Sequence, residues 1–221
     1  MAETRPDNSH AALMDGVYRS QRHFYDLTRK YYLLGRDGAL ASMAPKPGQS
    51  VLEVGCGTGR NLALAAKRFP EARLFGFDIS SQMLKTAEEK MEKHGISNRV
   101  TLAQADATNF DPKALYGETG FDRILISYAI SMIPVWEEAI QHAATQLNPG
   151  GELHVVDFGQ QADLPGWFKS GLQAWLAKFH VEPRANLKGV LEDAASNIGG
   201  SAQLASLYRD YAWHGVVRQQ G

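Results

Sequence analysis

The sequence has one cysteine, Cys56, in 221 residues, so it can form no internal disulfide and no zinc site built from several cysteines. The histidines show no ligand spacing either, and we predict no metal site. No apolar run is long enough to span a bilayer, and no signal-peptide pattern opens the chain. A formal net charge of −1 gives no overall attraction to nucleic acid or to an anionic membrane. We therefore expect a cytoplasmic protein, at most peripheral on the inner face of the membrane.

What is present is typical of a globular enzyme of one principal domain. Hydrophobic residues make up 44% of the chain and charged residues 21%. A chain of this length can bury a substantial core. Residues 1 to about 12 are polar and lack periodicity, so we expect a frayed tail there.

A glycine-rich stretch from 51 to 62 organises the rest of the chain. It combines an apolar strand, a turn with glycines at 55, 57 and 59, and the start of a helix. A strand that leads through glycines into a helix N-terminus is typical of a nucleotide site. The dinucleotide pattern is not met, because Arg60 stands where its third glycine belongs. Glu53 would repel a pyrophosphate but suits a ligand that carries an ammonium and a sulfonium.

Strands and helices alternate through the middle of the chain. We predict further strands over 73–77, 99–104, 121–127 and 152–158, helices over 62–68, 83–93 and 137–147, and a closing hairpin within 203–218. This order predicts an α/β fold, a doubly wound Rossmann-like sheet of seven strands with a closing antiparallel strand and helices on both faces. Asp78 ends the second strand, where an acid can accept hydrogen bonds from both ribose hydroxyls.

The spacing E-x-G-x-G-x-G resembles motif I of the class I S-adenosylmethionine-dependent methyltransferases. Leu147-Asn-Pro-Gly-Gly151 before an apolar strand is a second hallmark, and 127–134 resembles the loop beside the reactive methyl. The resemblance covers about residues 45 to 218 and implies S-adenosyl-L-methionine as cofactor. The loop at residues 127–134 lacks the N-P-P-Y or D-P-P-Y sequence of enzymes that methylate adenine or glutamine amides. This argues against a nucleic-acid partner.

The resemblance also implies which residues hold the cofactor. They are Tyr18, Arg36, Glu53, Gly55, Cys56, Gly57, Asn61, Asp78, Ile79, Met83, Asp106, Ala107, Ser127 and Tyr128. Two of these have competing interpretations. Asp106 either holds the adenine amino group or is a turn residue, and Cys56 is either a small residue fitted to a tight loop or a nucleophile.

The segment from 15 to 34 has the periodicity of a helix with two stripes. One stripe is apolar and predicts a core face. The other combines tyrosines with arginines: Tyr18, Arg22, Tyr25, Arg29 and Tyr32. Either the tyrosines pack over a neighbouring element with the arginines at their edges, or the stripe forms a wall of the substrate site. In the second case arginines bind a carboxylate or phosphate, and tyrosine rings face a methylated ammonium.

Residues 14 to 37 resemble the start of the bacterial diacylglycerylhomoserine N-methyltransferases, which complete a betaine lipid by three methyl transfers. The resemblance implies that a lipid at the membrane surface is the partner, that Arg22 or Arg29 binds its carboxylate, and that Tyr25 and Tyr32 hold its nitrogen. Asp26 and His23 are weaker candidates for a proton acceptor. Residues 1–44 would then carry the tail and the substrate-site helices, and residues 45–221 the methyltransferase domain.

Three alternative functions remain open at this stage. The protein could methylate phosphatidylethanolamine, act as a soluble small-molecule O- or C-methyltransferase, or bind S-adenosylmethionine without catalysis. In addition, residues 164–179 predict a helix with one apolar face and lysines beyond it. That helix is either packed on the sheet or forms an interfacial helix or acyl-chain groove.

Overall fold

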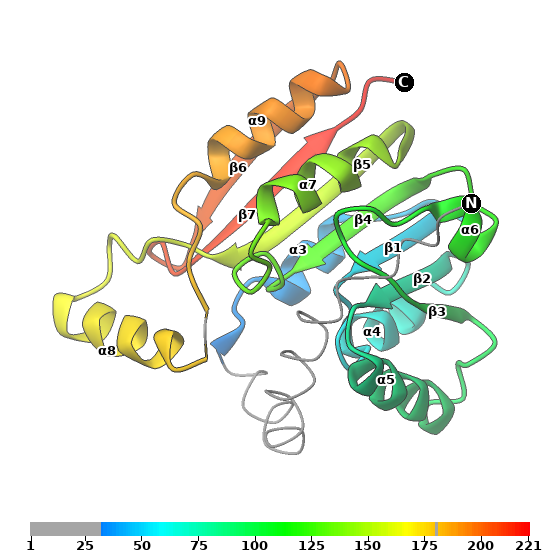
Figure 1. The fold of residues 1–221 in the computed structure, drawn as a ribbon, viewed down its shortest axis with the longest axis horizontal. Helices are drawn as coiled ribbons and strands as arrows, with labels where there is room; N and C mark the ends of the chain where they lie inside the picture. The colour runs from blue at the N-terminus through cyan, green and yellow to red at the C-terminus, as the bar shows by residue number, and fades with distance from the viewer. Residues whose placement is uncertain (1–31, 180) are drawn as a thin grey trace, which may run out of the picture.

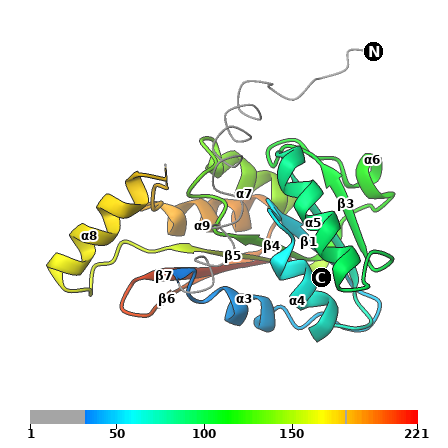
Figure 2. The same cartoon turned by 90° about the horizontal axis from the view of Figure 1, so that it is seen from below.

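The computed structural model describes residues 32–179 and 181–221, which fold into one sheet with helices on both faces (Figures 1 and 2). The strands are β1 (Ser50–Val54), β2 (Arg73–Asp78), β3 (Val100–Gln104), β4 (Phe121–Ser127), β5 (Leu147–Phe158), β6 (Ser201–Leu207) and β7 (Ala212–Arg218). Their order in the sheet is β3-β2-β1-β4-β5-β7-β6. The first five are parallel, and β7 runs antiparallel between β5 and β6. The predicted doubly wound sheet with its closing hairpin is confirmed.

Two hydrophobic clusters lie on the two faces of this sheet. One receives α3 (Arg36–Ser42), α4 (Arg60–Arg68) and α5 (Ser81–Lys93), and the other receives α7 (Trp136–Thr145) and α9 (Leu187–Asn197). Ser80 caps α5, where its hydroxyl accepts a hydrogen bond from the Met83 N–H. Packing on both faces explains why β1 is buried at every position and β4 at most of its positions. No helix in the described ranges is long and apolar enough to cross a membrane.

Three element boundaries differ from the sequence prediction. The helical pattern predicted up to residue 34 ends at Tyr32, and α3 begins at Arg36. Gly35 forms the turn between Tyr32 and α3, with a left-handed φ of 80°. The strand β5 begins at Leu147, before the glycines, with an irregular register against β4. The helices α6 (Pro112–Tyr116) and α9 were not predicted.

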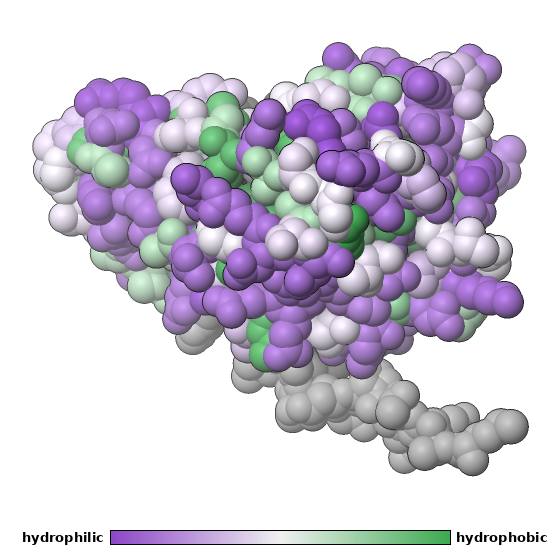
Figure 3. Space-filling model, turned by 90° about the horizontal axis from the view of Figure 1, so that it is seen from above, coloured by the Kyte–Doolittle hydropathy of each residue, from purple (hydrophilic) through white to green (hydrophobic). Residues whose placement is uncertain are grey.

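The helix α8 (Gly166–Ala177) extends from the sheet as an arm (Figures 1 and 2). Among its residues only Leu176 is buried, while the side chain of Trp167 is 79% exposed and that of Phe168 is 40% exposed. The interpretation of this segment as a helix packed on the sheet is therefore wrong. Only its C-terminal part reaches the core, through Leu172, Trp175 and Leu176. In Figure 3 hydrophobic surface gathers between the arm and the main body, on a face that is otherwise largely hydrophilic.

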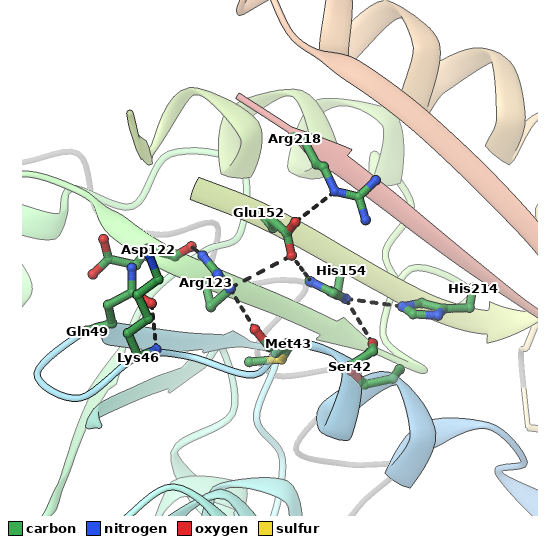
Figure 4. A network of polar contacts seen from close by, with 11 residues as sticks. Ser42, Met43, Lys46, Gln49, Asp122, Arg123, Glu152, His154, His214 and Arg218 are labelled. Atoms are coloured by element: carbon green, nitrogen blue, oxygen red, sulfur yellow. Dashed lines mark hydrogen bonds and ion pairs between the residues drawn. The ribbon is translucent and has the colours of Figure 1, made fainter. Parts of the chain in front are cut away.

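A buried polar network joins α3 to strands β4, β5 and β7 (Figure 4). At its centre Glu152 accepts hydrogen bonds from Arg218 at 2.7 Å and from His154 at 3.1 Å. The other ring nitrogen of His154 lies 3.2 Å from His214. Burial lowers the pKa of His154 to about 4, although the Glu152 carboxylate acts in the opposite direction. His154 is therefore neutral at physiological pH.

Candidate active site

A cavity of about 330 Å³ opens at the carboxyl ends of strands β1, β2, β3 and β4. It is called the donor cavity below. Every described residue that the sequence assigned to the cofactor lines it: Arg36, Glu53, Gly55, Cys56, Gly57, Asn61, Asp78, Ile79, Met83, Asp106, Ala107, Ser127 and Tyr128. Tyr18 lies outside the described residues. The volume falls in the range of small-molecule sites, so the sequence motifs meet in one place of suitable size.

The glycine turn after β1 is shaped by close approach to its neighbours. Gly57 has a φ of 54°, which disfavours side chains, and its N–H donates to Asp78 Oδ2 at 2.8 Å. Asp78 Oδ1 accepts a second bond from the Ser80 N–H at 2.9 Å. A Cβ added to Gly59 would lie 2.6 Å from Met91 Cε of α5. The carboxylate of Asp78 thus fixes the turn, and its remaining lone pairs suit hydroxyl donors from a ribose.

Glu53 is a buried acid in the wall of the donor cavity. Its side chain is 3% exposed, and Oε1 accepts a bond from Asn61 Nδ2 at 2.7 Å. Oε2 is buried without a hydrogen-bond partner among the described residues. Burial raises the pKa of Glu53 to about 8, against the Asn61 bond and the nearby Arg36 charge. A buried acceptor that lacks a donor fits a ligand that supplies an ammonium group.

Asp106 makes the hydrogen bonds of a turn residue and also lies in the wall of the donor cavity. Its Oδ1 accepts bonds from the Thr108 N–H at 2.9 Å and the Thr108 hydroxyl at 2.8 Å, which is a turn geometry. The same residue lines the donor cavity between Ala105 and Ala107. The turn therefore holds the carboxylate at the cavity wall, next to small apolar neighbours that can cover a flat ring.

Cys56 is buried in the glycine turn. Burial raises the pKa of its thiol, with the carboxylates of Asp78 and Glu53 acting in the same direction. A thiol held in its neutral form is a poor nucleophile. The geometry therefore favours the interpretation as a small residue fitted to a tight loop.

The loop after β4 separates the donor cavity from a second, smaller one. Tyr128 adopts a φ of 53°, and its hydroxyl donates to the Leu34 carbonyl at 2.5 Å. Burial raises the pKa of this phenol, with the Asp157 carboxylate acting in the same direction. The loop beyond it is held by Arg184, which donates to the Ile130 carbonyl at 3.1 Å and the Ile133 carbonyl at 3.0 Å. These contacts fix the position of the loop between the two cavities.

The second cavity, called the aromatic cavity below, has a volume of about 20 Å³. It shares Leu33, Tyr128 and Met132 with the donor cavity. Its other walls are Tyr32, Ser131, Phe158, Trp175, Leu176, Phe179 and Val181. The ring of Tyr32 meets that of Trp175 edge to face at 4.6 Å, and Trp175 lies 5.0 Å from Phe179. Aromatic side chains therefore surround the space next to the donor cavity.

Only one of the four residues assigned to the acceptor falls in the described part of the chain. Tyr32 lines the aromatic cavity, while Arg22, Tyr25 and Arg29 lie outside the described residues, as do His23 and Asp26. The sequence analysis missed Phe158, Trp175 and Phe179 as site residues. Phe158 ends β5 at the sheet edge where Glu53 and Asp78 lie, so the strand-end rule could have found it. Trp175 and Phe179 were assigned only to the apolar face of their helix.

The family model and the relatives that match this chain are all methyltransferases. A family model described as a methyltransferase domain matches residues 45–204. The chain is 30% identical to a ubiquinone/menaquinone biosynthesis C-methyltransferase of Ruegeria sp., covering 82% of this chain and 72% of the relative. It is 25% identical to a demethylmenaquinone methyltransferase of Listeria welshimeri, covering 95% of this chain and 89% of the relative. These relatives are quinone methyltransferases, so the comparisons do not bear out the betaine-lipid family that residues 14–37 predicted.

Solved structures show the same fold. A phosphoethanolamine N-methyltransferase 2 of Haemonchus contortus in complex with S-adenosyl-L-methionine superposes with a TM-score of 0.66 at 18% identity. The match covers 84% of this chain but only 52% of that structure, so the chain spans about half its length. The plantazolicin methyltransferase BpumL, in complex with a substrate analogue and SAH, has a TM-score of 0.69 at 14% identity, with 96% of each chain covered.

Proposed function

The chain belongs to the class I S-adenosylmethionine-dependent methyltransferases, and from that premise we propose that it methylates the amine of a lipid head group, with diacylglycerylhomoserine as the first acceptor to test. S-adenosylmethionine supplies an electrophilic methyl group when bound. Glu53, Asp78 and Asp106 suit the ammonium, the ribose and the adenine of that donor, in this order. The loop at Tyr128 is where the acceptor would meet the methyl.

The observation that carries the choice of acceptor is the aromatic cavity. Its aromatic walls contact the same loop residues that close the donor cavity. Aromatic faces attract methylated ammonium groups, and this attraction persists as each methyl is added and hydrogen-bond donors on the nitrogen are lost. Tyr32, Trp175 and Phe179 are only partly buried, so they form the wall that must part to admit a head group.

The protein's task in this reaction is alignment and exclusion of water. A neutral amine is nucleophilic enough to attack a sulfonium methyl without a covalent enzyme intermediate. The apolar loop residues Met132 and Ile133 are partly buried in the wall of the donor cavity, where they help to exclude water from the reacting groups. The predicted Arg22 and Arg29 would supply the carboxylate contact for a homoserine head group.

The test is methyl transfer by the purified protein in mixed micelles that contain one acceptor at a time. With diacylglycerylhomoserine, mass spectrometry should show mono-, di- and trimethylated lipid. With phosphatidylethanolamine or a demethylmenaquinol under the same conditions, we expect little product. Absence of methylated homoserine lipid, with the donor still bound in calorimetry, would reject this acceptor.

Two tryptophans of the same helix provide a matched pair for the acceptor site. Trp175→Ala removes a wall of the aromatic cavity and should lower lipid turnover by about tenfold, since loss of a cation–π contact costs roughly 1 to 2 kcal/mol. Trp167→Ala, at a side chain that is 79% exposed, should leave turnover in micelles unchanged. Donor affinity should be the same in both variants. Equal turnover in both would remove the aromatic cavity from the acceptor site.

The second candidate acceptor is a quinol ring carbon. The quinone methyltransferase names of the relatives at 30% and 25% identity favour it. An aromatic cavity also suits a flat quinol ring. A ring-methylated quinol, formed in the micelle assay without any methylated lipid, would establish this candidate over the amine.

A further inference from the structure

A buried acid lies at the carboxyl end of β5 and has no place in the donor site. Asp157 is 2% exposed and does not line the donor cavity. Its Oδ1 accepts a hydrogen bond from the Phe158 N–H at 2.8 Å, and its Oδ2 accepts one from the Ser131 N–H at 3.2 Å. Burial raises the pKa of Asp157 to about 6, so the carboxyl titrates near neutral pH. Such groups are candidates for proton transfer when they face a site.

Ser131 connects this acid to the aromatic cavity. The residue is 1% exposed and lines that cavity. Its hydroxyl makes no hydrogen bond of good geometry within the described part of the chain. It nevertheless lies near enough to help lower the pKa of Asp157. The hydroxyl thus stands between the cavity and the carboxylate, where it can accept a proton on one side and donate one on the other.

The other charged and titratable groups near Asp157 cannot replace it. Arg184 faces it from the segment after α8, but a guanidinium only donates hydrogen bonds. The Tyr128 phenol is bonded to the Leu34 carbonyl, and burial and the Asp157 charge both raise its pKa. Tyr32 is the remaining titratable residue of the described cavity wall, and it is a phenol. Asp157 is therefore the group near this cavity, among the described residues, that is ionised at neutral pH and can accept a proton.

We infer that Ser131 and Asp157 form a proton relay that removes a proton from the acceptor ammonium before each methyl transfer. The inference rests on the proposed amine acceptor. The ammonium gives a proton to Ser131 Oγ while the Ser131 hydroxyl gives its own proton to the Asp157 carboxylate. The freed nitrogen lone pair then forms a bond to the methyl carbon, and the carbon–sulfur bond breaks with its electron pair on sulfur. The Asp157 proton returns through Ser131 to water after the product leaves.

An apolar cavity makes this transfer feasible. Loss of solvation in this cavity lowers the pKa of an ammonium toward that of the buried carboxyl, and the cation–π attraction of the aromatic rings offsets part of this effect. General-base catalysis of this kind contributes about a hundredfold or more to the rate. Asp157 makes no contact with the acceptor in this relay. It receives the proton through the Ser131 hydroxyl.

The experiment is a pH profile of lipid methylation in micelles for the wild type, Ser131→Ala and Asp157→Asn. The wild type should gain activity as the pH rises through about 6. Both variants should be slower by about a hundredfold at neutral pH and recover at alkaline pH, where the free amine forms in solvent. Ser131→Ala removes only the hydroxyl and leaves the backbone bond to Asp157 in place, so it should fold as the wild type does. The exposed Ser170→Ala and Asp163→Asn serve as controls with wild-type profiles.

The outcomes separate the relay from the proposed function. Wild-type profiles in both variants, or a loss of rate that is equal at every pH, would overturn the relay while the lipid activity of the wild type stands. A wild type that methylates no amine at any pH would overturn the proposed function, and the relay with it. Donor affinity and thermal unfolding, measured for each variant, exclude a folding defect as the cause of a lost rate.

Discussion

Glu53 is a carboxyl group in a place where ionisation is costly until a cation arrives. Its pKa in the folded protein is about 8, raised by burial from 4.5. Because burial disfavours the ionised form, the contribution of Glu53 to the free energy of unfolding is complete below pH 4.5. It is lost as the pH rises to about 8. Binding an ammonium beside Oε2 would favour the ionised form. Donor binding and deprotonation of Glu53 are then coupled.

We predict that donor binding at pH 7 releases close to one proton, which calorimetry in buffers of different ionisation enthalpy can count. Glu53→Gln should abolish the release and weaken binding, yet raise the thermal stability of the ligand-free protein at pH 8, because no charge is then buried. The exposed Glu88→Gln is the matched control. Proton release that persists in Glu53→Gln would contradict the coupling.

At the scale of single residues, the sequence could predict the donor side because one rule covers it. Side chains at the carboxyl ends of adjacent parallel strands meet at one sheet edge, so Glu53, Asp78 and the loop of Asp106 were found together. Ser131 and Trp175 could not be found in this way. They come from a loop and an arm far apart in the chain, and only the tertiary structure brings them to one cavity.

At the scale of elements, the loop between β4 and α7 depends on the segment that follows α8. Arg184 bonds the Ile130 and Ile133 carbonyls, its guanidinium lies 5.7 Å from the Trp136 ring, and the Glu182 N–H donates to the Ser131 carbonyl at 3.0 Å. A planar guanidinium can bridge two carbonyls where an ammonium holds one.

Arg184→Met should therefore lower the free energy of unfolding by about 1 to 3 kcal/mol, because two carbonyls lose charged donors. It should also lower kcat more than donor affinity, since the loop faces the acceptor. Denaturant unfolding and steady-state kinetics measure the two effects. The exposed Arg68→Met is the control. Unchanged kcat in Arg184→Met would show that the loop holds its position without this clamp.

The arm α8 shows why an element can be predicted and its packing missed. Periodicity predicted the helix and its apolar face correctly. It could not say what covers that face, and only the C-terminal part reaches the core. The role of the tyrosine and arginine stripe over residues 18–32 stays a prediction, since only Tyr32 of its five residues falls in the described range.

At the scale of the whole molecule, the network around His154 limits acid stability. The pKa of His154 falls from 6.5 in a model side chain to about 4 in the folded protein, because the ring is buried. Because burial disfavours the protonated ring, the contribution of His154 to the free energy of unfolding is complete above pH 6.5. It is lost as the pH falls toward 4. The loss amounts to about 3 kcal/mol.

We expect the unfolding free energy of the wild type to fall steeply between pH 6.5 and 4, as followed by urea titration at several pH values. His154→Gln removes the titrating group and should flatten this slope, whatever its effect at neutral pH. The exposed His94→Gln should keep the wild-type slope. An unchanged slope in His154→Gln would mean that other groups govern the acid limit.

The overall fold was predictable because alternating strands and helices allow few topologies. The short turn that joins β6 and β7 explains why these two strands are neighbours, but it does not decide which of them pairs with β5. The polar network was not predictable, because His154 and Glu152 share a strand whose apolar pattern indicates only burial.

The donor cavity and the aromatic cavity share three wall residues, and this has a consequence for engineering. The acids that face the donor cavity lie between residues 53 and 106, whereas half of the residues that line the aromatic cavity lie between 158 and 181. Grafting the segment from β5 through Arg184 of a related enzyme would exchange that half of the aromatic cavity and leave the residues of the donor cavity in place. Chimeras with junctions just before β5 and just after Arg184 are the natural route to new methylation products on this scaffold.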